Sequence, residues 1–486
     1  MTKLIQNWQR EDRYRPYKDW SQDYKDTLKK SVAQSPWRAG YHIEPKTGLL
    51  NDPNGFSYFN GKWHLFYQNY PFGPVHGLKS WYELESTDLI HWHEKGTALQ
   101  PSSDYDSEGI FSGSARPINN ELFIFYTGNV RTKDWQRRAY QDGAVMDKSG
   151  TIKKLDLPLI KRPDDVTGNF RDPMLFEYQH QIYMMIGTQN KDDKLGRILI
   201  YKARDNNVKH WQRISELKVP QKYLGAIVEC PNLVFCGDRP VLIFCPQFLK
   251  KWVLDYQNVY PNTYLIGTKV DPETGEFKAH NSLHLVDKGF DSYATQAFNA
   301  PDGRTLAVSW LGLPEMTYPT DQYGYQGALS LVRELKVEDN ELFQYPVAET
   351  LQLRHDEQKN VQSAVIDNNQ YELEIEVPAE QTVSLKLFSN KAQTNYLLIE
   401  VSAETGQVII DRSNPKHPLN PKYGKTRMTH VLEHQPIKIN FFADASIFEC
   451  YVNSGERLLS GRYFPDEGEN HIYSDNTKFN IWKLKK

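Results

Sequence analysis

The amino-acid sequence predicts an all-β protein, a five-bladed β-propeller followed by a C-terminal β-sandwich. Short apolar or alternating runs bounded by polar turns indicate hairpin strands. Between residue 41 and about residue 340 such hairpins recur roughly every 60 residues, a length that holds the four strands of one blade and leaves room for about five. In the strands that follow, polar and apolar residues alternate strictly, and the hairpins do not recur at this spacing. Barrel or sandwich repeats satisfy the same strand count and stay open at this point.

Four hairpins carry the propeller prediction. In each, a polar turn precedes an apolar run, and Asn and Gly in such turns favour the backbone that tight hairpins need. The turns are residues 60–61, 119–120, 178–180 and 237–239, and the runs are residues 61–67, 121–126, 181–186 and 240–245.

The chain divides into four predicted parts. Residues 1–38 are polar, with aromatic and leucine side chains at spacings near three and four, which predicts a helical arm ending near Ser35-Pro36. Residues 39–345 are the predicted propeller and catalytic domain, and residues 346–358 a linker. Residues 359–486 are the predicted sandwich, whose alternating strands indicate sheets with one packed and one solvated face.

Composition limits the possible partners and compartments. The formal charge is −3, from 58 Lys and Arg against 61 Asp and Glu, so no basic field gathers nucleic acid or a membrane surface. The four cysteines show no Cys-x-x-Cys spacing, and no apolar run reaches the roughly 18 residues of a membrane span. We therefore expect a cytoplasmic protein that binds neither nucleic acid nor membrane.

Three carboxyl groups are the candidates for chemistry. Asp52 lies in the turn sequence Asn-Asp-Pro-Asn-Gly, Asp172 follows Arg171 and precedes a proline, and Glu229 ends an apolar run. Each alone has a plain structural interpretation as a turn residue, an arginine partner or an edge-strand residue. Together they supply what glycoside hydrolysis needs, namely a nucleophile, an acid and a further charge for the oxocarbenium-like transition state.

Five motifs occur in the order and approximate spacing of glycoside hydrolase family 32, the invertase and fructanase family, and the chain resembles that family from residue 41 onward. The motifs are residues 51–55, 111–115, 171–173, 229–231 and 289–294, with a C-terminal match at residues 444–449 and 460–465. This resemblance implies a five-bladed propeller followed by a sandwich, with the active site in the central funnel.

Matching motif positions imply roles for individual residues. Asp52 is then the nucleophile, Glu229 the general acid/base and Asp172 the stabiliser that binds fructosyl hydroxyls, and a retaining reaction needs the first two carboxyls roughly 5–5.5 Å apart. No cofactor or metal is expected, since His91 and His93 lack a third ligand nearby in the sequence. The expected substrate-binding residues are Leu49, Leu50, Asn51, Gln68, Phe111, Ser112, Arg171, Asp291, Tyr293 and Trp310.

Several positions depart from the family pattern. Leu49-Leu50 replaces the usual Trp-Met, and Ser292 stands where an aromatic residue is common. Residues 76–81 resemble the branch of the family found in the cytoplasm of Gram-positive bacteria that acts on sucrose 6-phosphate. His76 and Lys79 are then candidate neighbours of the phosphate, although an exposed lysine is commonly just solvated.

The resemblance implies a retaining β-fructofuranosidase, monomeric or homodimeric, that hydrolyses sucrose 6-phosphate, sucrose or both, with short fructo-oligosaccharides as further possible substrates. Two alternatives stay open. One is an exo-acting fructan or fructo-oligosaccharide hydrolase, or a transfructosylase in which a sugar replaces water. The other is a carbohydrate-binding propeller that has lost catalysis, against which the three intact carboxyl groups argue.

Overall fold

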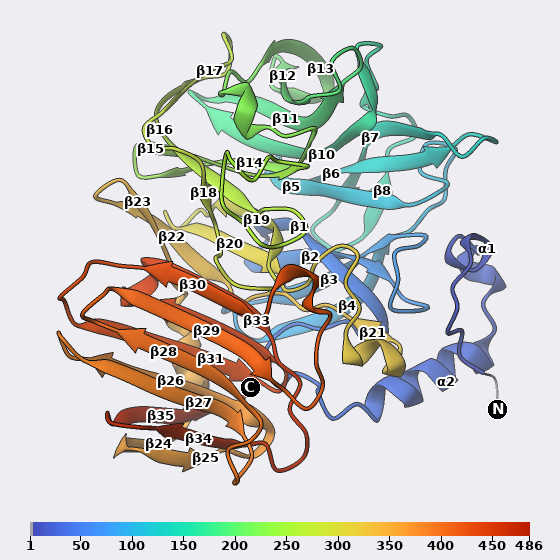
Figure 1. The fold of residues 1–486 in the computed structure, drawn as a ribbon. Helices are drawn as coiled ribbons and strands as arrows, with labels where there is room; N and C mark the ends of the chain where they lie inside the picture. The colour runs from blue at the N-terminus through green and yellow to red at the C-terminus, as the bar shows by residue number, and fades with distance from the viewer. Residues whose placement is uncertain (1–2) are drawn as a thin grey trace.

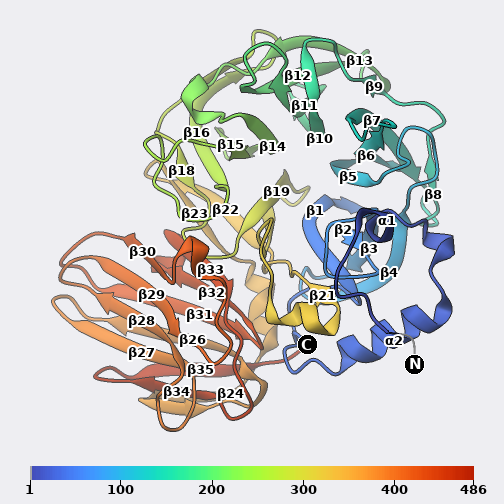
Figure 2. The same ribbon diagram turned by 45° about the vertical axis from the view of Figure 1, so that its right-hand side comes forward.

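The computed structural model describes residues 3–486. Within these residues the chain forms a helical arm, a ring of five β-sheets around a central axis, and two further sheets stacked beside the ring (Figures 1 and 2). In Figure 1 the stacked sheets lie below the ring, in orange and red, and the arm lies to the right in blue. This arrangement confirms the predicted propeller and sandwich.

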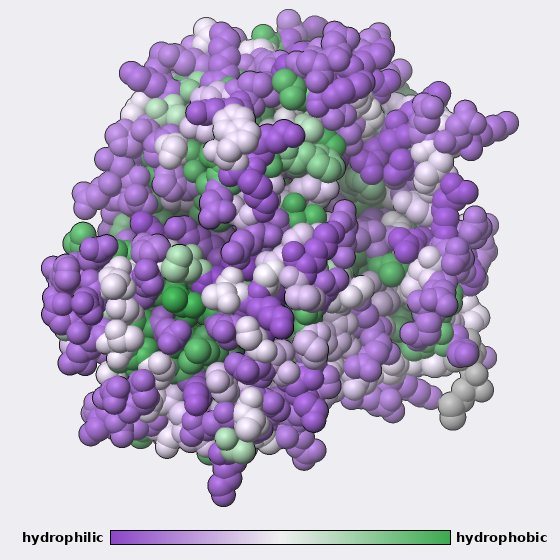
Figure 3. Space-filling model, in the orientation of Figure 1, coloured by the Kyte–Doolittle hydropathy of each residue, from purple (hydrophilic) through white to green (hydrophobic). Residues whose placement is uncertain are grey.

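The arm contains α1 (Arg10–Arg13), η1 (Tyr17–Asp19) and α2 (Gln22–Ala33). The hydroxyl of Ser21 caps α2 by accepting the backbone N–H of Tyr24 at 3.2 Å. Tyr24, Leu28 and Val32 recur every fourth residue and form its buried face. No helix in residues 3–486 is long and apolar enough to cross a membrane, and the face in Figure 3 is mostly hydrophilic.

Each blade is an antiparallel sheet whose first strand lies nearest the axis, as Figure 2 shows. The blades are β1 (Gly48–Phe59), β2 (Lys62–Tyr70), β3 (Ser80–Ser86) and β4 (Trp92–Leu99); β5 (Ile110–Ile118), β6 (Glu121–Arg131), β7 (Arg137–Met146) and β8 (Ile152–Lys154), with β9 (Ile160–Lys161); β10 (Val166–Tyr178), β11 (Gln181–Asn190), β12 (Gly196–Arg204) and β13 (Asn207–Glu216); β14 (Ile227–Cys236), β15 (Arg239–Gln247), β16 (Thr263–Asp271) and β17 (Glu276–Ala279), with β18 (His284–Leu285); and β19 (Tyr293–Asn299), β20 (Thr305–Trp310), β22 (Arg333–Glu338) and β23 (Glu341–Pro346). The connections include η2 (Gln221–Tyr223), η3 (Pro319–Tyr323) and β21 (Tyr325–Gln326), which pairs with β1 in parallel.

The predicted turns join the first two strands of their blades. Asn60 and Gly61 have φ of 50° and 79°, and Asn119 and Asn120 have φ of 50° and 66°. Two successive residues with positive φ match the right-handed twist of the strands that they join. The local turn signals thus correctly predicted the hairpins β1–β2 and β5–β6.

The sandwich consists of two six-stranded sheets. The first sheet contains β24 (Arg354–Val361), β35 (Phe479–Leu484), β26 (Gln370–Val377), β31 (Ile437–Asp444), β32 (Ile447–Val452) and β33 (Arg457–Arg462). The second sheet contains β25 (Ser363–Val365), β34 (His471–Ser474), β27 (Thr382–Ser389), β28 (Tyr396–Ser402), β29 (Gln407–Asn414) and β30 (Thr426–His430). The connecting 3-10 turns are η4 (Ala348–Leu353), η5 (Asp367–Asn369), η6 (Pro421–Tyr423) and η7 (Asn453–Gly455).

The outer face of the first of these sheets is not solvated at β31 and β32, which differs from the expectation for strictly alternating strands. Phe441 and Cys450 point into the sandwich core, whereas Phe442 and Tyr451 belong to a hydrophobic cluster of the propeller. The two parts therefore share a buried apolar boundary.

Buried charges lie at the same boundary. His42 contacts Asp444 through Nδ1 at 3.0 Å and Glu449 through Nε2 at 2.9 Å, and all three side chains are inaccessible to solvent. Asp444 also accepts the backbone N–H groups of Gly40, Tyr41 and His42 at 2.6–2.8 Å. We call His42, Asp444 and Glu449 the junction network.

Candidate active site

The innermost strand of each blade is irregular at the motif that the sequence singled out. The register shifts between Leu50 and Pro53 in β1, between Arg171 and Met174 in β10, and between Glu229 and Asn232 in β14, and similar shifts occur in β5 and β19. Bulges of this kind bend a strand and redirect its side chains. Asp172 has a φ of 64°, a strained backbone for a residue other than glycine.

The redirected side chains line a cavity of about 490 Å³ at one end of the axis. That volume lies within the range of small-ligand sites. Its lining includes the three predicted catalytic carboxyls and most of the predicted substrate contacts, namely Asn51, Asp52, Gln68, His76, Lys79, Phe111, Arg171, Asp172, Glu229, Tyr293 and Trp310.

Asp52 is held by hydrogen bonds on both of its oxygens. The Oγ of Ser112 donates to Oδ2 at 2.6 Å, and the amide of Asn51 donates to Oδ1 at 2.9 Å. The Asn51 amide also donates to Gln68 at 2.9 Å. Burial raises the pKa of Asp52, although Ser112, the charge of Lys79 and Asn51 favour the ionised form. Ser112 therefore lies behind this carboxylate, outside the cavity lining.

Asp172 lies close to Asp52 across the axis. The thiol of Cys230 contacts both residues, at 3.8 Å from Asp52 Oδ2 and 3.7 Å from Asp172 Oδ2. The backbone N–H of Cys230 donates to Asp172 at 2.9 Å. Burial raises the pKa of Asp172 to about 7, a shift that Arg171 opposes and that Glu229 and Asp52 increase.

Glu229 accepts hydrogen bonds from three side chains. Arg171 donates to Oε1 from Nε at 3.1 Å and from Nη2 at 2.8 Å. Gln247 and Tyr293 donate to Oε2 at 2.6 and 2.7 Å. Burial alone would lower the pKa of Arg171, but the charges of Glu229 and Asp172 raise it. Arg171 is thus a fixed cation between the two acidic residues.

Lys79 and His76 lie on the cavity wall with different partners. The ammonium group of Lys79 donates to the side-chain oxygen of Asn51, beside Asp52, and burial lowers its pKa to about 7. His76 lies on the cavity wall with its side chain partly exposed, and desolvation there together with the charges of Lys79 and Arg13 lowers its pKa well below the usual value. His76 is therefore uncharged at neutral pH, and its ring centroid lies 6.2 Å from that of Trp310.

Four predicted substrate contacts do not line the cavity, namely Ser112 behind Asp52, and Leu49, Leu50 and Asp291. Leu49 and Leu50 are fully buried in hydrophobic clusters, Leu49 beneath the helical arm and Leu50 in the cluster shared by the first and last blades. Asp291 is also fully buried, and it accepts hydrogen bonds from Tyr318 and Arg412 at 2.7 Å and from the backbone of Arg462. Asp291 thus joins the propeller to the sandwich and does not line the cavity.

The sequence analysis missed other side chains that line the cavity. They are Tyr14, Arg131, Arg137, Asn169, Ile227, Gln247, Phe248, Pro314 and Glu315. Gln247 could have been found from hairpin register, because β15 runs antiparallel to β14 and places Gln247 opposite Ile227, two residues from Glu229. Tyr14 gave no local signal, since the arm reaches the cavity only through tertiary packing.

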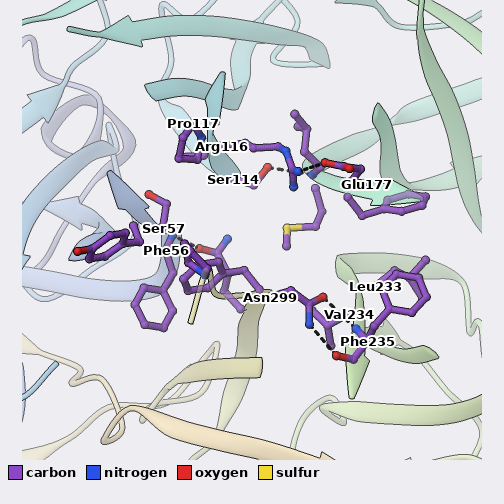
Figure 4. A pocket seen from close by; sticks show the side chains of 18 residues that line it. Phe56, Ser57, Ser114, Arg116, Pro117, Glu177, Leu233, Val234, Phe235 and Asn299 are labelled. Atoms are coloured by element: carbon purple, nitrogen blue, oxygen red, sulfur yellow. Dashed lines mark hydrogen bonds and ion pairs between the residues drawn. The ribbon is translucent and has the colours of Figure 1, made fainter. Parts of the chain in front are cut away.

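A second cavity of about 470 Å³ occupies the other end of the axis, where the same innermost strands end (Figure 4). Its charged residues Arg116 and Glu177 pair with each other, and Asn299 bonds to the backbone of Phe235. The remaining lining is largely apolar. The three clustered carboxyl groups belong to the first cavity, which is therefore the candidate active site.

Comparison with known proteins agrees with this arrangement. Residues 42–346 match the description "Glycosyl hydrolases family 32 N-terminal domain", and residues 341–485 match "Glycosyl hydrolases family 32 C terminal". The chain belongs to glycosyl hydrolases family 32. Membership in the family makes it a glycoside hydrolase, and the resemblance inferred from the motifs is confirmed.

Three proteins illustrate its place among glycosyl hydrolases of family 32. The chain is 48% identical to a sucrose-6-phosphate hydrolase of Streptococcus mutans, over 97% of this chain and 98% of that protein. A solved structure of sucrose-6-phosphate hydrolase from Lactobacillus gasseri is 41% identical, with a TM-score of 0.96 and 99% of both chains covered. A Bombyx mori GH32 beta-fructofuranosidase mutant solved with sucrose is 28% identical, with a TM-score of 0.82 over 96% and 98% of the two chains.

Proposed function

We propose that this protein is a retaining β-fructofuranosidase that hydrolyses sucrose 6-phosphate to fructose and glucose 6-phosphate, and that also accepts sucrose. The observation that carries the proposal is that Asp52, Asp172 and Glu229 line one cavity. The thiol of Cys230 contacts both Asp52 and Asp172. Similarity to the sucrose-6-phosphate hydrolases of S. mutans and L. gasseri supports the phosphorylated substrate.

The first half of the reaction breaks the glycosidic bond. The carboxylate of Asp52 attacks the anomeric carbon of the fructosyl unit while the Glu229 carboxylic acid gives its proton to the departing glycosidic oxygen. Glucose 6-phosphate leaves, and a covalent fructosyl-enzyme remains on Asp52. Ser112 and Asn51 fix the attacking carboxylate in position through the hydrogen bonds described above.

The second half regenerates the enzyme. Glu229, now ionised, takes a proton from water as the water oxygen attacks the same anomeric carbon and the bond to Asp52 breaks. Fructose is released with retained configuration. Arg171 and Tyr293, which donate to Glu229 in the free protein, keep its carboxyl group in place through both changes of protonation.

Asp172 acts by charge and hydrogen bonding in this scheme. Its carboxylate accepts hydrogen bonds from the fructosyl hydroxyls and stabilises the positive charge that develops on the ring in the transition state.

We also propose a cytoplasmic location. All four cysteines are free thiols, in agreement with this location.

A product assay with sucrose 6-phosphate, sucrose and a short fructo-oligosaccharide tests the proposal. We expect release of fructose with the highest kcat/KM on sucrose 6-phosphate, and a fructosyl-enzyme trapped on Asp52 by mass spectrometry after acid quenching. Preference for the oligosaccharide would replace the proposed substrate, and turnover without any covalent species on Asp52 would replace the proposed mechanism.

A further inference from the structure

We propose that Arg131 and Arg137 form the subsite for the phosphate group of sucrose 6-phosphate. This inference rests on the proposed function and adds to it the residues that distinguish the phosphorylated sugar from the plain one. Both arginines line the cavity, and neither was predicted from the sequence.

The two residues lie on the leaving-group side of the cavity. Glu229, which protonates the departing oxygen, is bonded to Arg171, and Arg171 Nη1 donates to Asn169 Oδ1 at 2.8 Å. Arg137 Nη1 reaches the same Asn169 oxygen at 3.4 Å. A continuous set of contacts therefore leads from the acid to Arg137, and we place the glucosyl 6-phosphate on this side because its glycosidic oxygen receives the proton of Glu229 in the proposed reaction.

Arg131 and Arg137 face each other directly. They are cross-strand partners at the closed end of the β6–β7 hairpin, next to the loop of residues 132–136 that joins the two strands. Like charges placed opposite each other on neighbouring strands are destabilising. Such a pair becomes favourable when an anion lies between the two guanidinium groups, and a phosphate monoester, which carries about −1.5 to −2 charges at neutral pH, suits two arginines.

Neither guanidinium is satisfied by the protein. Among residues 3–486, the Nε atoms of Arg131 and Arg137 are buried without a hydrogen-bond partner. Their side-chain hydrogen bonds are long, 3.4 Å from Arg137 to Asn169 and 3.4 Å from Arg131 to the carbonyl of Trp135, and each guanidinium lies over an aromatic ring, that of Phe111 or Trp135. Burial lowers the pKa of Arg137 to about 9, and the charges of Arg171 and Arg131 add to the shift. An anion at this position relieves that cost.

The arm holds the hairpin that carries this pair. The ring of Tyr14 packs edge-on against Trp135 with centroids 4.9 Å apart, and Arg10 lies over the same ring at 4.8 Å. The carbonyl of Arg13 accepts the backbone N–H of Leu78 at 2.7 Å, which fixes the arm beside the cavity. The subsite is therefore supported by elements from both the arm and the second blade.

The residues expected from the sequence to neighbour the phosphate are less suitable. Lys79 already donates to Asn51 next to Asp52, which places its charge beside the nucleophile on the fructosyl side. His76 is neutral at physiological pH because of its lowered pKa. We assign them to the wall near Asp52 and the phosphate to the arginine pair.

The test compares kcat/KM on sucrose 6-phosphate and sucrose for Arg131→Gln, Arg137→Gln and the double variant. Each single change removes a charge-assisted contact, so we expect losses of about 10- to 100-fold on sucrose 6-phosphate and little change on sucrose. Arg138→Gln is the matched control, because Arg138 is adjacent in sequence and exposed. Glucose 6-phosphate should inhibit the wild type more strongly than glucose, and the variants should lose that difference.

Several outcomes separate this inference from the proposed function. Equal losses on both sugars, or a preference for sucrose 6-phosphate that survives in the double variant, would overturn the phosphate subsite and leave the β-fructofuranosidase intact. A wild-type enzyme that cleaves sucrose 6-phosphate no better than sucrose would do the same. A wild type that cleaves neither sugar would overturn the proposed function itself. Unchanged melting temperatures show that each variant is folded.

Discussion

Two of the regions that bury ionisable side chains differ in how those groups are paired, namely the active-site cavity and the junction network between propeller and sandwich. In the cavity, the pKa values of Asp52 and Asp172 are raised and that of Lys79 is lowered, all by burial. In the junction network, the hydrogen bonds and opposite charges that join His42 to the two carboxyls outweigh the effect of burial on their pKa values. The pKa values of Asp444 and Glu449 are therefore lowered and that of His42 is raised.

The difference separates catalysis from stability. A group shifted toward its neutral form makes the folded state less stable when it is ionised, whereas a group shifted toward its charged form adds stability. The charged groups in the cavity are thus not fully compensated by neighbouring protein groups, and they can interact with a substrate. The junction network pairs its charges within the protein.

The largest expected effect is the loss of activity in Asp52→Asn. Without a carboxylate nucleophile, turnover of sucrose 6-phosphate should fall by about 10⁴-fold or more. The variant should melt at the same temperature as the wild type or higher, because the buried charge is gone. Initial rates and thermal unfolding measure both quantities, with the exposed Asp238→Asn as control. Turnover within about tenfold of wild type would remove Asp52 from the mechanism.

The same exchange in the junction network should have the opposite character. Asp444→Asn breaks a buried ion pair and leaves His42 with one acidic partner, so the free energy of unfolding should fall by roughly 3–5 kcal/mol. Activity per folded molecule should be retained because the network lies outside the cavity lining. Urea unfolding measures the change. A loss of about 1 kcal/mol or less would contradict this prediction, because it would mean that the buried ion pair contributes no more stability than an exposed salt bridge.

The pH dependence of stability sharpens the contrast. The pKa of Asp172 rises from 3.8 to about 7 on folding, so the wild type loses stability as the pH increases through that window. Asp172→Asn should therefore be more stable than wild type at pH 7–8, with an advantage that disappears toward pH 4.

Asp444 should give the reverse trend in the same melting experiments. Its pKa is lowered on folding, so its contribution is present above its ordinary value of 3.8 and is lost as the pH falls through the lower folded value. The deficit of Asp444→Asn should be complete at pH 7 and should shrink only in acid. Parallel trends for the two variants would contradict the distinction between the regions.

The smallest expected effect concerns Ser112→Ala. Loss of the 2.6 Å hydrogen bond should raise the pKa of Asp52 further and reduce kcat/KM by about tenfold. The acidic limb of the pH profile should move to higher pH, since Asp52 attacks as the carboxylate in the proposed reaction. Ser114→Ala is the control two residues along β5, because its hydroxyl bonds to the carbonyl of Pro173. A limb that stays in place would show that Ser112 only supports the strand.

Local sequence signals and tertiary contacts differ in what they made predictable. The turns at Asn60-Gly61 and Asn119-Asn120 act through the backbone of adjacent residues, so the hairpins could be predicted from the sequence. The three carboxyls were found because each stands in a short motif. Asp291 also stands in a motif, but its burial against Arg412 depends on how the sandwich docks.

The same limit explains why the arginine pair was missed. Arg137 acquires its meaning from Asn169 and Arg171 in the next blade and from Arg131 across the hairpin. The contacts with Asn169 and Arg171 have no local signature, because they join two blades, and the pairing of Arg131 with Arg137 depends on the register of the hairpin. The bulges that aim the motifs at the axis are likewise a property of strand pairing.

The docking of the arm has a consequence for biosynthesis. The arm is translated before every element that covers it, and its buried face packs on Leu49, Tyr70, Phe72 and Tyr325. Tyr325 emerges only after most of the chain has been made, so the apolar side of α2 is only partly covered on the ribosome until the last blade is translated. Tyr14 and its part of the cavity wall are thus translated early but reach their final packing late.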